Sequence, residues 1–81
     1  MERKIIEEKV CNFLINDLEV DEERIYPEAR LKDDVGIDSL DFVDIVVCVE
    51  KVFGFKIKPE EMAKVITLND FYNYIEREIN A

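Results

Sequence analysis

The sequence contains no histidine, and its 81 residues include only two cysteines, Cys11 and Cys48. The lack of histidine removes the side chain that most often acts as a general base near neutral pH. Two cysteines without histidine do not make up any of the usual zinc ligand sets. Both cysteines lie within apolar helical patterns, where cysteine more often packs as a small hydrophobe than forms a disulfide. We therefore expect no metal, no catalytic residues and no enzymatic activity.

Long apolar runs and basic residues are also scarce. No stretch has the length of a membrane span and no signal peptide is recognisable, so we expect a cytoplasmic protein that does not enter a membrane. Eleven basic residues face twenty acidic ones, which gives a net charge of −9. A field of that sign repels nucleic acid and favours partners with basic docking patches. Because acidity also simply promotes solubility, the charge alone identifies no function.

The length and the apolar periodicity predict one small all-α domain, 1–81, with a thin core. We expect it to be a monomer. The predicted architecture is a four-helix bundle with three longer helices and one short helix. In chain order the expected helices cover residues 2–18, 39–53, 59–65 and a last segment that begins after Thr67.

Residues at the helix ends support these boundaries. Gly54 suits the position after the second helix, where a left-handed backbone is common. Thr67 is a good N-cap for the last helix, and Asp70 resembles the acidic half of a capping box. Segment 19–37 has no convincing period, which predicts a long loop between the first two helices. Its apolar residues are expected to hold it to the core; they are Val20, Ile25, Leu31, Val35 and Ile37.

The second predicted helix has two apolar faces instead of one. The first is expected to pack in the core and holds Phe42, Ile45, Val46, Val49, Val52 and Phe53. Leu40, Val43 and Val47 fall near the opposite side. Asp44 and Lys51 lie beside them, with Asp41 and Glu50 on the flanks. A small apolar strip rimmed by carboxylates is typical of a docking surface. The alternative is that the helix is central and buried on both sides.

Ser39 stands at the start of this helix. The simplest interpretation is that Asp38 or Ser39 caps the helix while Asp41 supports its first turn. A catalytic serine is disfavoured, because the sequence has no histidine and three aspartates surround the hydroxyl. A serine that receives a group from another enzyme has other needs: exposure, an ordered element and a nearby recognition surface. Ser39 is expected to meet all three.

The segment LKDDVGIDSLD, residues 31–41, closely resembles the phosphopantetheine attachment motif of acyl carrier proteins, L-x-x-D-L-G-x-D-S-L-D. The likeness covers residues 3–79. It implies that a phosphopantetheinyl transferase attaches 4′-phosphopantetheine from coenzyme A to Ser39. The thiol of that arm would carry acyl groups as thioesters between enzymes of fatty-acid or specialised lipid or polyketide-like biosynthesis, such as a ketosynthase. Phe42, where the family commonly has a small residue, favours the specialised pathway, as do Lys51, Lys56 and Lys58.

The resemblance also implies two groups of site residues. The partner-recognition face would consist of Asp38, Leu40, Asp41, Val43, Asp44, Val47 and Glu50. The candidates for the lining of an acyl pocket are Leu31, Phe42, Val46, Val49, Phe53, Ile57, Val65, Leu68 and Tyr74. Plain core packing explains each candidate equally well. Two other functions stay open: a carrier of amino acids, such as a peptidyl or D-alanyl carrier, and a helical adaptor in which Ser39 is only a cap.

Overall fold

The computed structural model describes residues 2–80. Within that range the regular structure is helical, apart from one isolated bridge between Arg30 and Thr67. The prediction of an all-α fold with three longer helices and one short one is therefore confirmed. In chain order the elements are α1 (Arg3–Asn16), the 3-10 turn η1 (Glu22–Arg24), α2 (Ser39–Phe53), α3 (Pro59–Met62) and α4 (Leu68–Asn80).

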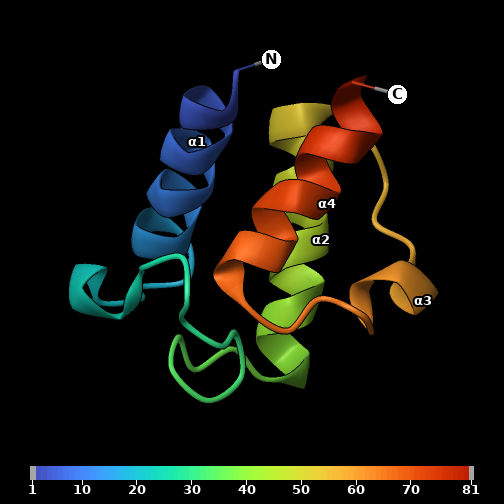
Figure 1. The fold of residues 1–81 in the computed structure, drawn as a ribbon. Coiled ribbons are helices and arrows are strands. Elements are labelled where there is room, and N and C mark those ends of the chain that lie inside the picture. The colour runs from blue at the N-terminus through green and yellow to red at the C-terminus, as the bar shows by residue number, and fades with distance from the viewer. Residues whose placement is uncertain (1, 81) are drawn as a thin grey trace.

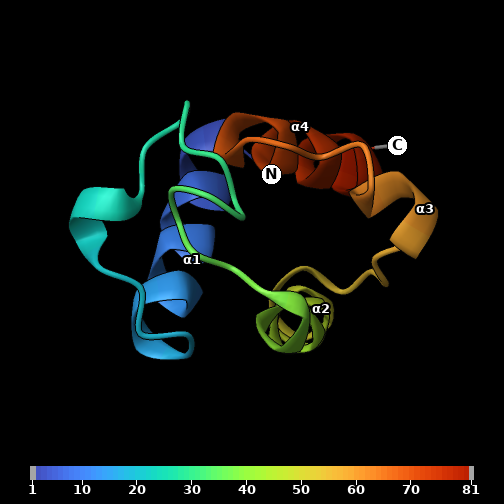
Figure 2. The same cartoon turned by 90° about the horizontal axis from the view of Figure 1, so that it is seen from below.

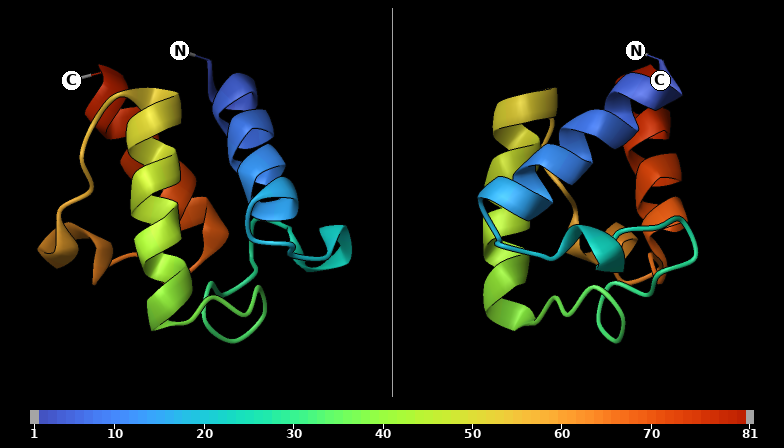
Figure 3. Two further views of the ribbon diagram at one scale, coloured as in Figure 1. Left: turned by 180° about the vertical axis from the view of Figure 1, so that it is seen from behind. Right: turned by 90° about the vertical axis from the view of Figure 1, so that its left-hand side faces the viewer.

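The three long helices surround one apolar core. Seen from below, α1, α2 and α4 lie on three sides of a common centre, and α3 lies on the side away from α1 (Figure 2). Figure 1 and the back view in Figure 3 show α4 passing diagonally across α2. Every side chain of the buried cluster is apolar or tyrosine. The fully buried residues include Ile6, Val10 and Leu14 of α1, Ile45 and Val49 of α2, and Leu68, Phe71 and Ile75 of α4.

The ends of the helices follow the predicted capping residues in most places. Gly54 adopts φ 80° after α2, as expected for a left-handed C-terminal residue. The Thr67 hydroxyl accepts the N–H of Asp70 at 3.2 Å, and an Asp70 carboxylate oxygen accepts the N–H of Thr67 at 3.1 Å. The expected third helix over 59–65 was too long. After Met62 the backbone N–H groups of Lys64 and Val65 bond three residues back, so the chain continues as turns.

The long loop between α1 and α2 is held by its own apolar side chains. Leu31, Val35 and Ile37 are buried, and Val20 and Ile25 are half-buried against the core, as predicted. The backbone joins the loop to the segment before α4. The N–H of Leu31 donates to the carbonyl of Ile66, and the N–H of Leu68 donates to the carbonyl of Ala29. This pairing fixes the loop just before it enters α2, and with it the start of that helix.

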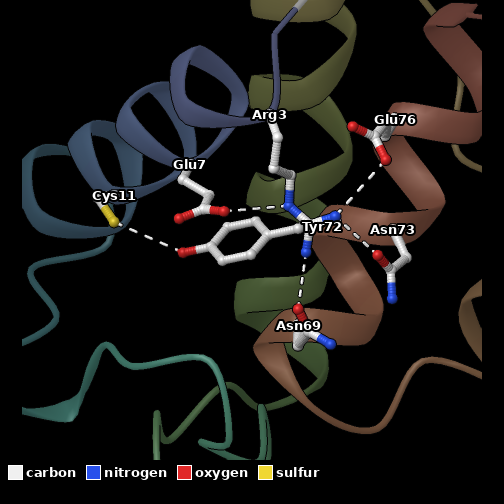
Figure 4. Close-up of polar contacts among 7 residues, drawn as sticks. All are labelled: Arg3, Glu7, Cys11, Asn69, Tyr72, Asn73 and Glu76. Atoms are coloured by element: carbon white, nitrogen blue, oxygen red, sulfur yellow. Dashed lines mark hydrogen bonds and ion pairs between the residues drawn. The ribbon is translucent and has the colours of Figure 1, made fainter.

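Arg3 fastens the start of α1 to α4 (Figure 4). Its guanidinium donates to the side-chain oxygens of Asn69 and Asn73, both at 2.7 Å. It also lies 5.4 Å from the centre of the Tyr72 ring and forms ion pairs with Glu7 and Glu76. The charge is thus satisfied on several sides at once, and these contacts join the first turn of α1 to α4.

Both cysteines are free thiols in this structure. Burial, with the nearby Asp17 carboxylate, raises the pKa of the Cys48 thiol, which favours its neutral form. None of the described helices has the length and apolar character needed to cross a membrane. Over residues 2–80, no group of three or more potential ligand side chains is placed to hold a metal ion.

Candidate functional site

Asp38, and not Ser39, caps α2. One carboxylate oxygen of Asp38 accepts the backbone N–H groups of Leu40 at 2.9 Å and Asp41 at 3.0 Å. A carboxylate oxygen of Asp41 accepts the N–H of Asp38 at 3.3 Å, which completes a capping box. Of the two caps that the sequence allowed, the structure selects Asp38. Ser39 is therefore the first residue of the helix itself.

The Ser39 side chain is left without a structural task. It is exposed, and its hydroxyl forms no hydrogen bond with any residue of the described part of the chain. Ser39 is also the only serine in the sequence. The single threonine, Thr67, uses its hydroxyl to cap α4. Ser39 thus offers a free aliphatic hydroxyl on an ordered element, which is what a modifying enzyme requires.

The surroundings of Ser39 have both signs of charge. The first turn of a helix carries a partial positive charge, which favours an anionic group there. The carboxylates of Asp38 and Asp41 lie in the same turn and form its capping box, so they oppose that attraction. On the loop side, the guanidinium of Arg30 lies 3.8 Å from Asp33, whereas Lys32 has no ion-pair partner among residues 2–80.

The two-faced pattern of α2 is confirmed in its geometry. On the outer face Leu40 is 79% exposed, Val43 58% and Val47 53%. On the inner face Ile45 and Val49 are fully buried, and Phe42, Val46, Val52 and Phe53 are half-buried. The alternative, a central helix buried on both sides, is therefore wrong. Around the apolar strip Asp38, Asp44 and Glu50 are exposed and Asp41 is half-buried, so the face combines aliphatic side chains with carboxylates.

An open cavity of about 580 Å³ lies directly beside Ser39. The loop 30–33, the start of α2, α3 and the segment before α4 contribute to it. The residues that line it are Arg30, Leu31, Lys32, Asp33, Ile37, Asp38, Ser39, Phe42, Pro59, Met62, Ala63, Val65 and Ile66. Its floor is apolar, and its charged residues come from the loop side and from Asp38.

Only part of the expected acyl-pocket set lines this cavity. Leu31, Phe42 and Val65 do so. The other six candidates belong to the core or pack against it without reaching the cavity; they are Val46, Val49, Phe53, Ile57, Leu68 and Tyr74. Contact of any of the nine with cargo stays a prediction. Sequence reasoning missed Ile37, Met62, Ala63 and Ile66, because nothing in the apolar pattern marks a residue as lining a cavity.

Comparison with known proteins agrees with this geometry. Residues 8–75 match the family model described as the phosphopantetheine attachment site. The chain is 40% identical over 77 residues to the acyl carrier protein of Thermotoga maritima, an alignment that covers 95% of each protein. It is 38% identical over 79 residues to the acyl carrier protein of Coprothermobacter proteolyticus, covering 98% of this chain and 96% of that protein. The chain belongs to the acyl carrier protein family.

Acyl carrier proteins are non-catalytic and carry phosphopantetheine, whose thiol holds an acyl group as a thioester. The residues present fit that group. Ser39 supplies an exposed hydroxyl that no neighbour binds, and the adjoining cavity offers apolar surface within reach of anything attached there. The likeness covers nearly the full length of both relatives, so it includes the helices that form the cavity as well as the motif around the serine.

Proposed function

We propose that Ser39 is the residue to which a phosphopantetheinyl transferase attaches 4′-phosphopantetheine. The observation that carries this proposal is the division of labour at the start of α2. Asp38 caps the helix, which leaves the hydroxyl of the only serine in the sequence exposed and without a hydrogen bond to any of residues 2–80. In the transfer, the Ser39 Oγ loses its proton and bonds to the phosphorus that carries the pantetheine. The pyrophosphate P–O bond of coenzyme A breaks, and adenosine 3′,5′-bisphosphate leaves. We further propose that residues 1–81 act as one monomeric carrier domain in the cytoplasm.

The outer face of α2 is the proposed docking surface for the transferase and for acyl-processing enzymes such as a ketosynthase. Leu40, Val43 and Val47 are exposed apolar side chains that a partner would desolvate on contact. The carboxylates of Asp44 and Glu50 beside them complement a basic patch and speed encounter with it. Because the strip starts one residue after Ser39, a partner bound there has the attachment residue within its reach.

The test is a loading reaction with coenzyme A and a promiscuous phosphopantetheinyl transferase, followed by intact mass. The wild-type protein should gain one arm, and Ser39→Ala should gain none. Val47→Glu, which adds charge to the strip without touching Ser39, should load more slowly. Ile5→Glu, which adds the same charge at an exposed apolar residue of α1, is the matched control and should load at the wild-type rate. Failure of the wild-type protein to load with several transferases would contradict the proposal.

The second candidate function is an amino-acid carrier, which shares the arm and differs in the cargo. The acyl carrier is favoured because the two relatives named above are acyl carrier proteins. Loading assays of the holo protein distinguish the two. An acyl group should be transferred by an acyl-processing enzyme, and an amino acid should not be transferred by an adenylating enzyme.

A further inference from the structure

The cavity beside Ser39 ends at a wall and does not continue into the bundle. Phe42 of α2, Met62 of α3 and Val65 after it line the cavity on one side and pack with the core on the other. We call these three residues the inner wall. In the core, Ile45 and Val49 of α2 have no exposed surface. No space large enough for a water molecule therefore touches them, as expected for a close-packed interior.

Phe42 is the member of the inner wall nearest to the attachment residue in the chain. It follows Ser39 by three positions, so both side chains lie on neighbouring points of one helix side. Long side chains on a helix lean toward its N-terminus, which places the Phe42 ring over the turn that contains Ser39. Phe42 is half-buried and lines the cavity. A group attached to Ser39 that folds back into the cavity meets this ring.

We propose that the inner wall, and Phe42 above all, restricts the cargo to short acyl chains that lie in the cavity, outside the packed core. This inference rests on Ser39 as the attachment residue. A longer chain has two options. It can force Phe42 and Met62 out of close-packed contacts, which is costly. It can instead leave its outer methylenes in water, where they contribute nothing to stability.

The test is a series of carrier forms made by transferring the acyl-pantetheine group from butyryl-, octanoyl- and dodecanoyl-coenzyme A. In the wild-type protein Tm should rise from the holo form to the octanoyl form by about 2 °C or more, because buried methylenes stabilise the fold. It should rise no further with dodecanoyl. In Phe42→Ala, which lengthens the cavity, the rise should continue to dodecanoyl. Val52→Ala is the matched control, a half-buried residue of the same helix that does not line this cavity, and should keep the wild-type limit.

A second variant and a second measurement keep the test decisive if Phe42→Ala folds poorly. Ala63 is exposed and lines the cavity, so Ala63→Phe should fill the cavity. In that variant Tm should not rise even from the holo form to the octanoyl form. By NMR, the methyl signals of Val49 should be the same in the wild-type octanoyl and dodecanoyl forms. They should shift on dodecanoyl loading only in Phe42→Ala.

The outcomes separate the two proposals. A Tm that keeps rising through dodecanoyl in the fully loaded wild-type protein would overturn the inner wall and leave Ser39 unaffected. A Tm that stops rising at octanoyl in Phe42→Ala, as it does in the wild-type protein, would also overturn the proposed role of the inner wall. A protein that gains no mass with any of the acyl donors counts against attachment at Ser39 instead.

Discussion

Asp38 and Ser39 are neighbours with separate roles. Either residue type is a good N-cap, so the sequence left the choice between them open. The structure makes the choice, because the Asp38 carboxylate accepts two backbone N–H groups and the Ser39 hydroxyl accepts none. This choice matters for function, since a hydroxyl engaged in capping is less available for modification. It also rules out the interpretation in which Ser39 serves only as a cap.

The two residues should therefore respond differently to alanine. Asp38→Ala removes the cap and should lower the free energy of unfolding by about 1 kcal/mol. Ser39→Ala removes no hydrogen bond and should stay within about 0.5 kcal/mol of wild type. Urea unfolding of both variants of the apo protein measures the difference. A loss of equal size in Ser39→Ala would show that its hydroxyl does cap the helix.

The capping carboxylate of Asp70 makes the stability of the fold depend on pH. The backbone N–H of Thr67, followed by that of Ile66, holds the pKa of the Asp70 carboxyl below its ordinary value. The stability that the ionised carboxylate contributes is therefore present above its unfolded pKa of about 3.9 and is lost as pH falls through the lower folded pKa.

Asp70→Asn should test this dependence directly. Its deficit in free energy of unfolding relative to wild type should be constant above about pH 5 and should shrink below about pH 4. Asp44→Asn, which removes the same charge from an exposed position on α2, is the control for net charge. An Asp70→Asn deficit that does not change between neutral and acid pH would contradict the role of the ionised cap.

At the scale of elements, periodicity and capping chemistry predicted most of the fold. The buried stripe of α4, the two faces of α2 and the left-handed Gly54 all follow from local spacing and backbone preference. The end of α3 and the lining of the cavity could not be predicted from local spacing and backbone preference. Met62, Ala63 and Ile66 come to face Ser39 only because three separate segments pack together, and no local pattern records that placement.

The contact between α1 and α4 is the second feature that the sequence did not reveal. Arg3 satisfies two asparagines of α4 that are 66 and 70 residues away in the chain. Arg3→Ala should lower the free energy of unfolding by about 1 to 2 kcal/mol through lost hydrogen bonds and lost packing on Tyr72. Lys4→Ala, at an exposed neighbour in the same turn, is the matched control and should have little effect. Equal effects in urea unfolding would show that the Arg3 contacts contribute nothing.

At the scale of the whole molecule, acidity favours the proposed docking but weakens the fold. The net charge is −9, and the five ion pairs found among residues 2–80 all involve partly exposed side chains, which contribute little each. The apolar core is small, as expected for a domain of this length. Mutual repulsion of the carboxylates therefore lowers the free energy of unfolding noticeably.

Salt should consequently stabilise the protein. Raising sodium chloride from low ionic strength should raise Tm by about 4 °C or more, since screening reduces the repulsion. The triple variant Glu8→Gln, Glu23→Gln, Glu60→Gln, which neutralises three exposed carboxylates, should melt higher at low salt and gain less from added salt. Differential scanning calorimetry measures both. A flat or falling Tm in the wild-type protein would show that the charges are already balanced locally.

The central claim is that the only serine of this acyl carrier protein is its attachment residue. Tandem mass spectrometry of the protein loaded from coenzyme A tests it most directly, because fragment ions assign the added mass to a residue. We expect one phosphopantetheine, on Ser39, in every loaded molecule. An arm on any other residue, or a Ser39→Ala protein that still accepts one, would contradict it.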